Sequence, residues 1–167
     1  QPTSGELILD GAPVEFADSE VGENHGVILI HQELNLAEQL TVEENIFLGR
    51  EINRGWFLDK AAMRAEAKKL LDQLQCDVDP RTRIKDLAVS DRQMVEIAKA
   101  LSKNADILIL DEPTAVLTGR EVDILFDQVK RLREQGVAIL YISHKLDEIK
   151  AIADRVTVLR DGRLITS

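Results

Sequence analysis

The sequence predicts an α/β domain in which helices cover both faces of a parallel sheet and a helical subdomain is inserted into that core. Two observations predict this class. Continuous apolar runs of strand length alternate with amphipathic helices in the second half of the chain, and the middle of the chain shows only helical periodicity. We therefore assign residues 1–37 and 104–167 to the core and residues 38–103 to an all-helical subdomain.

Short apolar segments bounded by turn residues predict the strands. The first two flank a turn at Asp10-Gly11 and the last two flank a turn at Asp161-Gly162, so each pair is expected to form a hairpin. The three strands between these hairpins are continuously apolar, as expected for strands buried in a parallel sheet. The predicted strands are residues 6–9, 14–16, 27–30, 107–110, 137–142, 155–159 and 163–166.

Helix starts are marked by capping boxes, in which Ser or Thr is followed three residues later by Glu or Gln. Thr41, Ser90 and Thr118 each begin such a box, and Asp59 can cap a further helix. Apolar residues then recur at the spacing of one helix face. The stripes are Met63, Ala67, Leu70, Leu71 and Leu74 after Asp59, then Met94, Ile97, Ala98 and Leu101 after Ser90, and Val122, Leu125, Phe126, Val129 and Leu132 after Thr118. A short helix over residues 146–153 follows the strand 137–142.

Composition excludes several classes of protein. The formal net charge of −9, from 30 acidic and 21 basic residues, argues against a protein that mainly coats nucleic acid, so no nucleic-acid partner is expected. Cys76 is the single cysteine, which excludes an intramolecular disulfide and a Cys-rich zinc site. No apolar run approaches the ~18 residues of a membrane span. Because the sequence begins with Gln1 rather than Met, we expect a processed or shortened chain.

The strongest chemical signal is a pair of consecutive carboxylates, Asp111 and Glu112, directly after the apolar run 107–110. Ligands bind outside the carboxyl ends of parallel strands, so this pair is expected at a site. Ionised carboxylates at the end of a buried strand are costly unless they are compensated, and a divalent cation is the usual compensation. Alternating side-chain directions let Asp111 face a metal while Glu112 faces a neighbouring water. A plain polar turn is the alternative, which the aliphatic run before the pair and the Pro-Thr after it disfavour.

The segment LILDEPT, which contains these acids, resembles the Walker B segment of ABC-type ATPases. Other segments agree in order along the chain. IHQE resembles the Q-loop, LAVSDRQ stands where the signature LSGGQ is expected, AVLT follows at the D-loop position, and YISH resembles the switch-histidine segment. The strings IHQELNL, TVEENIFLGRE, QMVEIAKAL and VLRDG are similar to the first ATPase cassette of bacterial sugar importers of the ribose, xylose and galactose kind. The resemblance spans nearly all 167 residues.

This resemblance implies a role for each motif. Gln32 would contact magnesium and the attacking water, and Asp111 would hold Mg²⁺ directly or through water. Glu112 would polarise the water for attack on the γ-phosphate of ATP, and His144 would steady that phosphate. Backbone N–H groups of the signature turn would bind the γ-phosphate of ATP held by an opposite cassette. The signature positions assigned to nucleotide binding are Ala88, Val89, Ser90, Asp91 and Gln93.

The same resemblance implies cofactors, partners and location. ATP and Mg²⁺ are expected in the intact family protein, with transmembrane permease subunits and a second ATPase cassette as partners. The permease is expected to contact the helical insertion near the Q-loop. The subunit would be cytoplasmic and peripheral on the inner face of the plasma membrane.

Two features depart from the family pattern. A phosphate loop of this superfamily needs G-x-x-x-x-G-K-[ST], and the 167 residues contain no such string. We therefore expect an N-terminally truncated cassette that alone neither binds nor hydrolyses Mg-ATP, exposes apolar surface beside the strand 107–110 and self-associates. In the signature, Ala88 replaces the usual Ser and Ser90 the usual Gly. Ser90 adds a Cβ where Gly allows close approach, and we expect it to cap its own helix.

Two other functions remain open. A non-catalytic binding or assembly module would keep the shape of the cassette, and the absent phosphate loop and altered signature favour it. A DNA-repair or chromosome-structure ATPase shares Walker B, but the sugar-importer strings and the lack of a long coiled coil argue against it. Taken singly, Gln32 could be a surface amide and His144 a structural histidine, yet each follows a buried strand, which favours function.

Overall fold

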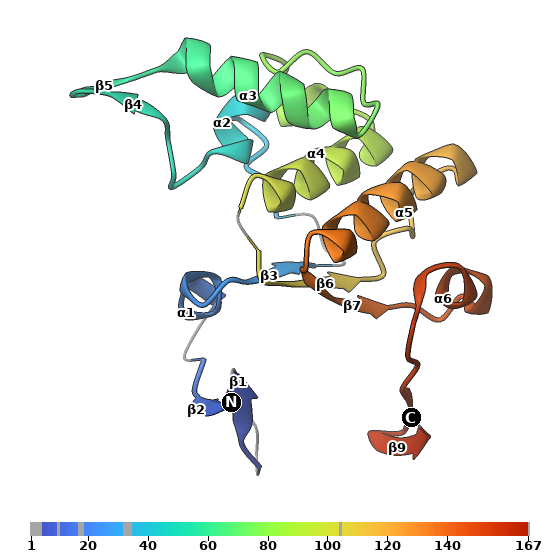
Figure 1. The fold of residues 1–167 in the computed structure, drawn as a ribbon. Coiled ribbons are helices and arrows are strands. Elements are labelled where there is room, and N and C mark those ends of the chain that lie inside the picture. Colours follow the sequence, from blue (N-terminus) through green and yellow to red (C-terminus); the bar gives the residue numbers. More distant parts are fainter. Residues whose placement is uncertain (1–4, 10, 17–18, 32–34, 104, 167) are drawn as a thin grey trace.

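A three-stranded parallel sheet forms the centre of the molecule (Figure 1). The structure, a computed structural model, describes residues 5–9, 11–16, 19–31, 35–103 and 105–166. The strands are β3 (Val27–Ile30), β6 (Ile107–Asp111) and β7 (Ala138–Ile142), in the order β3-β6-β7. They are the three continuously apolar runs of the sequence, and all pair in parallel, so that prediction is confirmed. Their carboxyl ends therefore lie along one edge of the sheet.

In the described part of the chain, helices cover one face of this sheet and leave the other open. α4 (Val89–Leu101) and α5 (Gly119–Glu134) lie over it, whereas α1 (Ser19–Asn24) packs beside β3 and α6 (Leu146–Ile152) follows β7 (Figure 1). On the opposite face Leu29, Leu140 and Ile142 are 40%, 53% and 48% exposed. The expectation of helices on both faces is therefore wrong for the described residues, because none of their helices packs there. The expected apolar surface beside β6 is confirmed.

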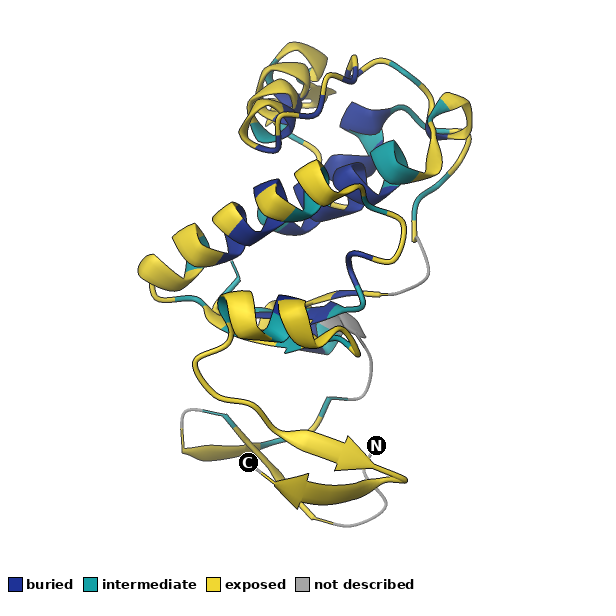
Figure 2. Ribbon diagram, turned by 90° about the vertical axis from the view of Figure 1, so that its right-hand side faces the viewer, coloured by how far each residue is buried: buried dark blue, intermediate teal, exposed yellow. Residues whose placement is uncertain are grey.

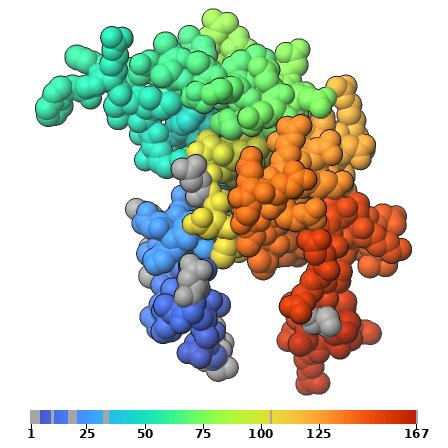
Figure 3. Space-filling view, viewed as in Figure 1, coloured from blue at the N-terminus to red at the C-terminus, as the bar shows by residue number. Residues whose placement is uncertain are grey.

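Residues 38–103 form a layer above the sheet. This layer contains α2 (Val42–Ile46), α3 (Lys60–Gln73), the short 3₁₀ helix η1 (Ile84–Asp86) and α4. It also contains a hairpin of β4 (Asn53–Arg54) and β5 (Phe57–Leu58), which projects away from the body (Figures 1 and 3). The all-helical prediction is therefore wrong at this hairpin, where Gly55 takes a φ of 65° at the turn. Trp56 at its tip is fully exposed.

Two further hairpins leave the sheet on its open side. β1 (Leu7–Leu9) pairs with β2 (Ala12–Val14), and β8 (Val158–Arg160) pairs with β9 (Arg163–Thr166), both antiparallel. In the space-filling view they form two separate projections, one at each end of the chain (Figure 3). The predicted hairpin at Asp161-Gly162 is confirmed, although its first strand begins at Val158 rather than at residue 155.

The helix caps confirm three of the four predicted starts. Thr41 and Thr118 form complete capping boxes with Glu44 and Glu121. Asp59 caps α3 by accepting from the backbone N–H of Ala62 at 2.9 Å. Ser90 is different, and the prediction that it caps its own helix is wrong.

In α4 the N-cap position is taken by Ala88, which has no side-chain hydrogen bond, and Ser90 lies inside the first turn. The chain is already helical at Val89. A serine can cap only from an extended conformation before the first turn.

One apolar core joins the sheet to the helical layer. Buried residues lie where the helices face the sheet and one another, whereas β8 and β9 are exposed throughout (Figure 2). The predicted stripes supply this core, with Met63, Ala67 and Leu71 from α3 and Met94, Ile97 and Ala98 from α4, and Val95 of α4 joins them. No helix among the described residues is long and apolar enough to cross a membrane.

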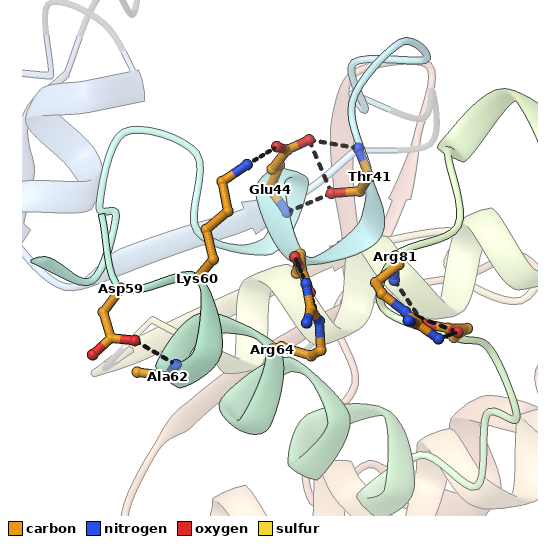
Figure 4. A network of polar contacts seen from close by, with 9 residues as sticks. Thr41, Glu44, Asp59, Lys60, Ala62, Arg64 and Arg81 are labelled. Atoms are coloured by element: carbon orange, nitrogen blue, oxygen red, sulfur yellow. Dashed lines mark hydrogen bonds and ion pairs between the residues drawn. The ribbon is translucent and has the colours of Figure 1, made fainter. Parts of the chain in front are cut away.

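Ion pairs fix α2 against α3 at the top of the molecule (Figure 4). Glu44 accepts from the backbone N–H of Thr41 at 3.0 Å and lies 3.4 Å from Nζ of Lys60. The backbone and side-chain hydrogen bonds from Thr41 are the main cause that lowers the pKa of Glu44. Arg64 makes two hydrogen bonds to the buried carboxylate of Glu43, at 2.9 and 3.0 Å. An Arg fork paired with a carboxylate in this way makes two charge-assisted hydrogen bonds, which fix the geometry of the contact.

Candidate functional site

The two acids of the strongest motif lie at the carboxyl end of the central strand. Leu108 and Leu110 of β6 are buried under the helices, and Asp111 ends the strand opposite Ile142 of β7. Glu112 follows with a φ of 45°, in the left-handed region that residues with a Cβ adopt only at a cost. Its backbone N–H donates to the carbonyl of Ile142 at 3.0 Å, which ties it to the neighbouring strand.

His144 reaches this same rim, as the sequence predicted from its place after the next parallel strand. Its Nδ1 lies 2.9 Å from Oε1 of Glu112. An ionised carboxylate can only accept hydrogen bonds, so Nδ1 of the ring donates and Nε2 is directed elsewhere. The side chain of His144 is 73% exposed and that of Glu112 is 29% exposed. The pair is therefore preformed and open to a ligand.

A second cluster of polar side chains, centred on Glu148, joins the residues that follow Glu112 to those that precede His144. The sequence did not predict it. The carboxylate of Glu148 on α6 is buried and accepts from Oγ1 of Thr114 at 2.7 Å. Its other oxygen accepts from the Tyr141 hydroxyl at 2.8 Å and from Oγ of Ser143 at 3.0 Å. Lys145 Nζ lies 3.0 Å from the first oxygen. The sequence offered one signal, the string LDEPT together with an acid, Glu148, four residues after His144. That signal does not specify the contact between Glu148 and Thr114.

The donors keep the Glu148 carboxylate ionised. Burial alone would raise its pKa, but the hydrogen bonds from Thr114, Tyr141, Lys145 and Ser143 outweigh burial and hold the pKa below the ordinary value of 4.5. Tyr141 responds in the opposite direction. Burial and the hydrogen bond to a negative partner both raise the pKa of its hydroxyl, so it stays a donor. The cluster is thus a buried anion whose oxygens are both satisfied.

The signature segment lies away from this rim, at the start of α4. Ala88 and Val89 are exposed, and Ser90 and Asp91 are half-buried. Gln93 is buried, and its Nε2 has no hydrogen-bond partner among the described residues. Within the described ranges no hydrogen bond or ion pair joins residues 88–93 to the acids of β6 or to the histidine. The structure therefore brings Glu112 and His144 into contact, whereas the signature residues 88–93 make no hydrogen bond or ion pair with either of them in the described part of the chain.

Gln32 lies outside the described residues. His31, the residue before it, lines a cavity of about 250 Å³ between α1, β3 and α4. Glu96 and Lys103 are also among the lining residues. Burial raises the pKa of Glu96, whose Oε2 has no partner in the described part of the chain. Neither Asp111 nor Glu112 lines this cavity, so it is separate from the acid–histidine rim.

The acids of β6 suit magnesium by the chemistry of their oxygens. No group of three or more His, Cys, Asp or Glu residues in the described ranges could enclose a metal ion. Magnesium is usually held by one or two carboxylates, with waters and substrate phosphates completing the shell, and Asp111 at the end of β6 is a carboxylate of this kind. The residues that usually bind the triphosphate are not among the 167, because the sequence contains no phosphate-loop string.

The family model described as ABC transporter matches residues 1–115, more than half of the chain. This chain belongs to that family. It is 52% identical to the ribose import ATP-binding protein RbsA 1 of Rubrobacter xylanophilus over 99% of the chain and 33% of the relative. It is 53% identical to the xylose import ATP-binding protein XylG of Photobacterium profundum over 96% of the chain and 32% of the relative.

The chain thus spans about a third of the length of the curated relatives it matches. Its resemblance to sugar import ATP-binding subunits of the ABC transporter family, expected from the motif strings, is confirmed.

Solved structures confirm the fold of this ABC transporter segment. A dimeric ATP-binding cassette in a post-hydrolysis state, bound to ADP and Pi, superposes with a TM-score of 0.85 over 99% of the chain and 73% of the cassette. A nucleotide-free ATP-binding cassette from an ABC transporter gives 0.79 over 98% of the chain and 69% of the cassette. Both are 23% identical, so they establish the fold alone.

Proposed function

We propose that these residues are part of the ATP-hydrolysing subunit of an ABC importer that energises sugar uptake. The observation that carries the proposal is the 2.9 Å contact between Glu112 and His144 at the carboxyl end of β6, directly after the Walker B run. The relatives named for ribose and xylose import support the substrate class. In this proposal the hydrolysis of ATP opens a sandwich of two cassettes and drives a membrane partner.

The chemistry assigned to the rim follows from acid–base geometry. Glu112 accepts a proton from water and orients that water for in-line attack on the γ-phosphate. When both ring nitrogens carry a proton, Nδ1 of His144 holds Glu112 and Nε2 donates to the γ-phosphate. Asp111 holds magnesium, which when bound neutralises the charge of the phosphates. Gln32, which follows β3 in the sequence, is assigned to the metal and to the water.

The start of α4 is proposed to serve a second cassette. Ala88 makes no side-chain cap, and no side chain of the described residues bonds to the first-turn N–H groups of the helix, which can meet an anion from outside. Positions Ala88, Val89, Ser90, Asp91 and Gln93 are assigned to the γ-phosphate of ATP on the opposite cassette. The dimeric solved cassette of the same fold is consistent with such a pair.

The 167 residues by themselves are proposed to be inactive. Backbone N–H groups and a lysine neutralise the triphosphate in phosphate-loop ATPases, and no string in the sequence supplies them. Isothermal calorimetry of the chain with Mg-ATP is expected to give no binding in the micromolar range. Phosphate release is expected only from a longer subunit that supplies a phosphate loop. Micromolar binding by the 167 residues alone would overturn this part of the proposal.

A non-catalytic binding or assembly module is the second candidate. The altered signature, with Ala88 and Ser90, and the absent phosphate-loop string favour it. Phosphate release discriminates the two candidates in a full-length subunit that carries these residues. Turnover that stops when Glu112→Gln is introduced supports the ATPase, and absence of turnover in the unmodified subunit supports the module.

The partners follow from the proposed function. Transmembrane permease subunits are proposed to contact residues 38–103, and the subunit is placed on the cytoplasmic face of the plasma membrane. No nucleic-acid partner is proposed, in keeping with the net charge of −9.

Self-association of the chain is proposed through the open face and the edge strand β7. Leu140 is 53% exposed there. Light scattering is expected to show oligomers that Leu140→Lys reduces, whereas Leu164→Lys on the outer hairpin does not. A monomeric unmodified chain would refute the proposal.

A further inference from the structure

We propose that Glu148 is a positioning residue, which holds the turn after β6 and the turn after β7 together so that Glu112 and His144 stay in contact. The positional part of this inference stands on the geometry of the chain, whereas its consequence for turnover rests on the proposed function. Glu148 itself does not contact Glu112 or His144 through any hydrogen bond within the described residues. It acts through their neighbours.

The Glu148 carboxylate joins the two turns, and Nζ of Lys145 adds a direct hydrogen bond to Oγ1 of Thr114 at 3.1 Å. Thr114 lies two residues after Glu112, and its hydroxyl donates to Oε1 of Glu148 at 2.7 Å. Ser143 directly precedes His144, and its hydroxyl donates to Oε2 at 3.0 Å. Each oxygen of the carboxylate therefore holds a different turn. Such a carboxylate fixes the separation of the two turns, because each of its oxygens accepts a charge-assisted hydrogen bond from a different turn.

Backbone strain at Glu112 makes such support necessary. Its φ of 45° is unfavourable for a residue with a Cβ, and conformations of this kind persist only where surrounding contacts hold them. One contact is the bond from Glu112 N–H to the carbonyl of Ile142. A second is the buried hydroxyl of Thr114, which fixes the end of the same turn. Without the second contact the turn can relax and move the Glu112 carboxylate away from the ring.

The chain offers a matched pair of substitutions. Glu148→Gln replaces one carboxylate oxygen with a donating NH₂ group, which faces hydroxyls that already donate. Asp147→Asn makes the same chemical change one residue earlier, also in the first turn of α6, where the side chain is exposed. Both remove one negative charge from the same helix end. Any difference between them therefore comes from the buried contacts and not from charge or helix dipole.

The first experiment uses the 167-residue chain and needs no nucleotide. The ring nitrogens of His144 are observed by ¹⁵N NMR above the titration range of the imidazole, where the two neutral tautomers are distinguished. Because Nδ1 donates to Glu112, the Nδ1–H tautomer of His144 is expected to dominate in the unmodified chain and in Asp147→Asn. Glu148→Gln is expected to shift the population towards the Nε2–H tautomer. An unchanged tautomer population in Glu148→Gln would overturn the inference.

A second variant covers the case in which Glu148→Gln does not fold. Thr114→Val removes the hydroxyl that joins the first turn to Glu148 and to Lys145, and it keeps the branched shape of the side chain. It is expected to shift the His144 tautomer in the same direction and by a smaller amount. A folded Thr114→Val chain in which the tautomer population of His144 is unshifted would contradict a positioning role for Glu148.

The second experiment measures turnover in a full-length subunit that carries these residues. Glu148→Gln is expected to lower kcat roughly 10- to 100-fold, as the loss of residues that orient reacting groups commonly does, while KM for ATP stays within about twofold. Asp147→Asn keeps both values. Equal losses in kcat and in ATP affinity, or no loss, would refute a positioning role. If the unmodified subunit has no turnover, the proposed function fails, and the tautomer experiment still decides the position of Glu148.

Discussion

Nδ1 of His144 lies 2.9 Å from Oε1 of Glu112, although the two residues are 32 positions apart in the chain. Their contact follows from the parallel pairing of β6 and β7, which brings the carboxyl ends of both strands to one edge of the sheet. The imidazole is mostly exposed, so its second nitrogen is available to a ligand. Two measurable consequences concern this edge of the sheet, and two further predictions concern other parts of the fold.

The proposed function predicts a loss of turnover when the histidine is removed. In a full-length subunit that carries these residues, His144→Ala is expected to lower kcat about 100-fold or more, the usual range for a group that acts in proton or charge transfer. ATP affinity is expected to change little. The matched control is His25→Ala, because His25 is exposed and follows α1 just before β3, at the edge of the sheet opposite the carboxyl ends that carry Glu112 and His144. Normal turnover by His144→Ala would remove the histidine from the mechanism.

The buried carboxylate of Glu148 predicts a pH dependence of stability. Its pKa is lower in the folded chain than the value of 4.5 expected in the unfolded chain, so its stabilising effect is present above about pH 4.5 and is lost as the pH falls below it. At pH 7, Glu148→Gln is expected to lower the free energy of unfolding by about 1.5–3 kcal/mol. The difference from the unmodified chain shrinks in acid. Urea titrations between pH 7 and pH 3 measure it, with Asp147→Asn as the variant that should follow the unmodified chain.

The capping residues predict unequal costs for similar substitutions. Thr118→Ala removes a complete capping box from α5 and is expected to cost about 1 kcal/mol of stability. Ser90→Ala, at the start of α4, is expected to change stability by less than ~0.5 kcal/mol because Ser90 lies inside the first turn and does not cap. Thermal unfolding of both variants checks this. A loss of the same size in Ser90→Ala would contradict the observed start of α4.

The single cysteine predicts a thiol that is inert in the folded chain. Cys76 is 7% exposed, and burial is the main cause that raises the pKa of its thiol to about 11. The reactive form is the thiolate, so a disulfide reagent at pH 8 is expected to label the folded chain only slowly. The same reagent should label the chain completely in denaturant. Rapid labelling without denaturant would show that the segment after α3 opens readily.

Local patterns predicted the elements that depend on local forces. The apolar runs became the strands of the sheet, and the boxes at Thr41 and Thr118 became helix starts, since each needs only neighbouring residues. Ser90 shows the limit of such rules. The same box was present, but the chain is already helical at Val89, so the serine lies inside the first turn and not at the extended position from which a side chain caps.

Contacts between distant segments were predicted less well. The hairpin with Trp56 was missed because two-residue strands leave no periodicity to detect. Helices were expected on both faces of the sheet, yet Leu29 and Leu140 are exposed. An apolar strand indicates that its faces can be buried, but it does not specify which segment buries them. The contact of Glu148 with Thr114 and Ser143 was also missed.

The order of apolar runs, caps and acids along the chain was sufficient for the α/β class and for placing Asp111, Glu112 and His144 at strand ends. Parallel pairing then makes their proximity a geometric necessity. The register between strands, the left-handed turn at Glu112 and the burial of Glu148 arise from folding. The reason is physical: hydrophobic burial acts on any apolar residue wherever it lies, whereas a hydrogen-bonded carboxylate depends on atoms that only the folded backbone brings within 3 Å of one another.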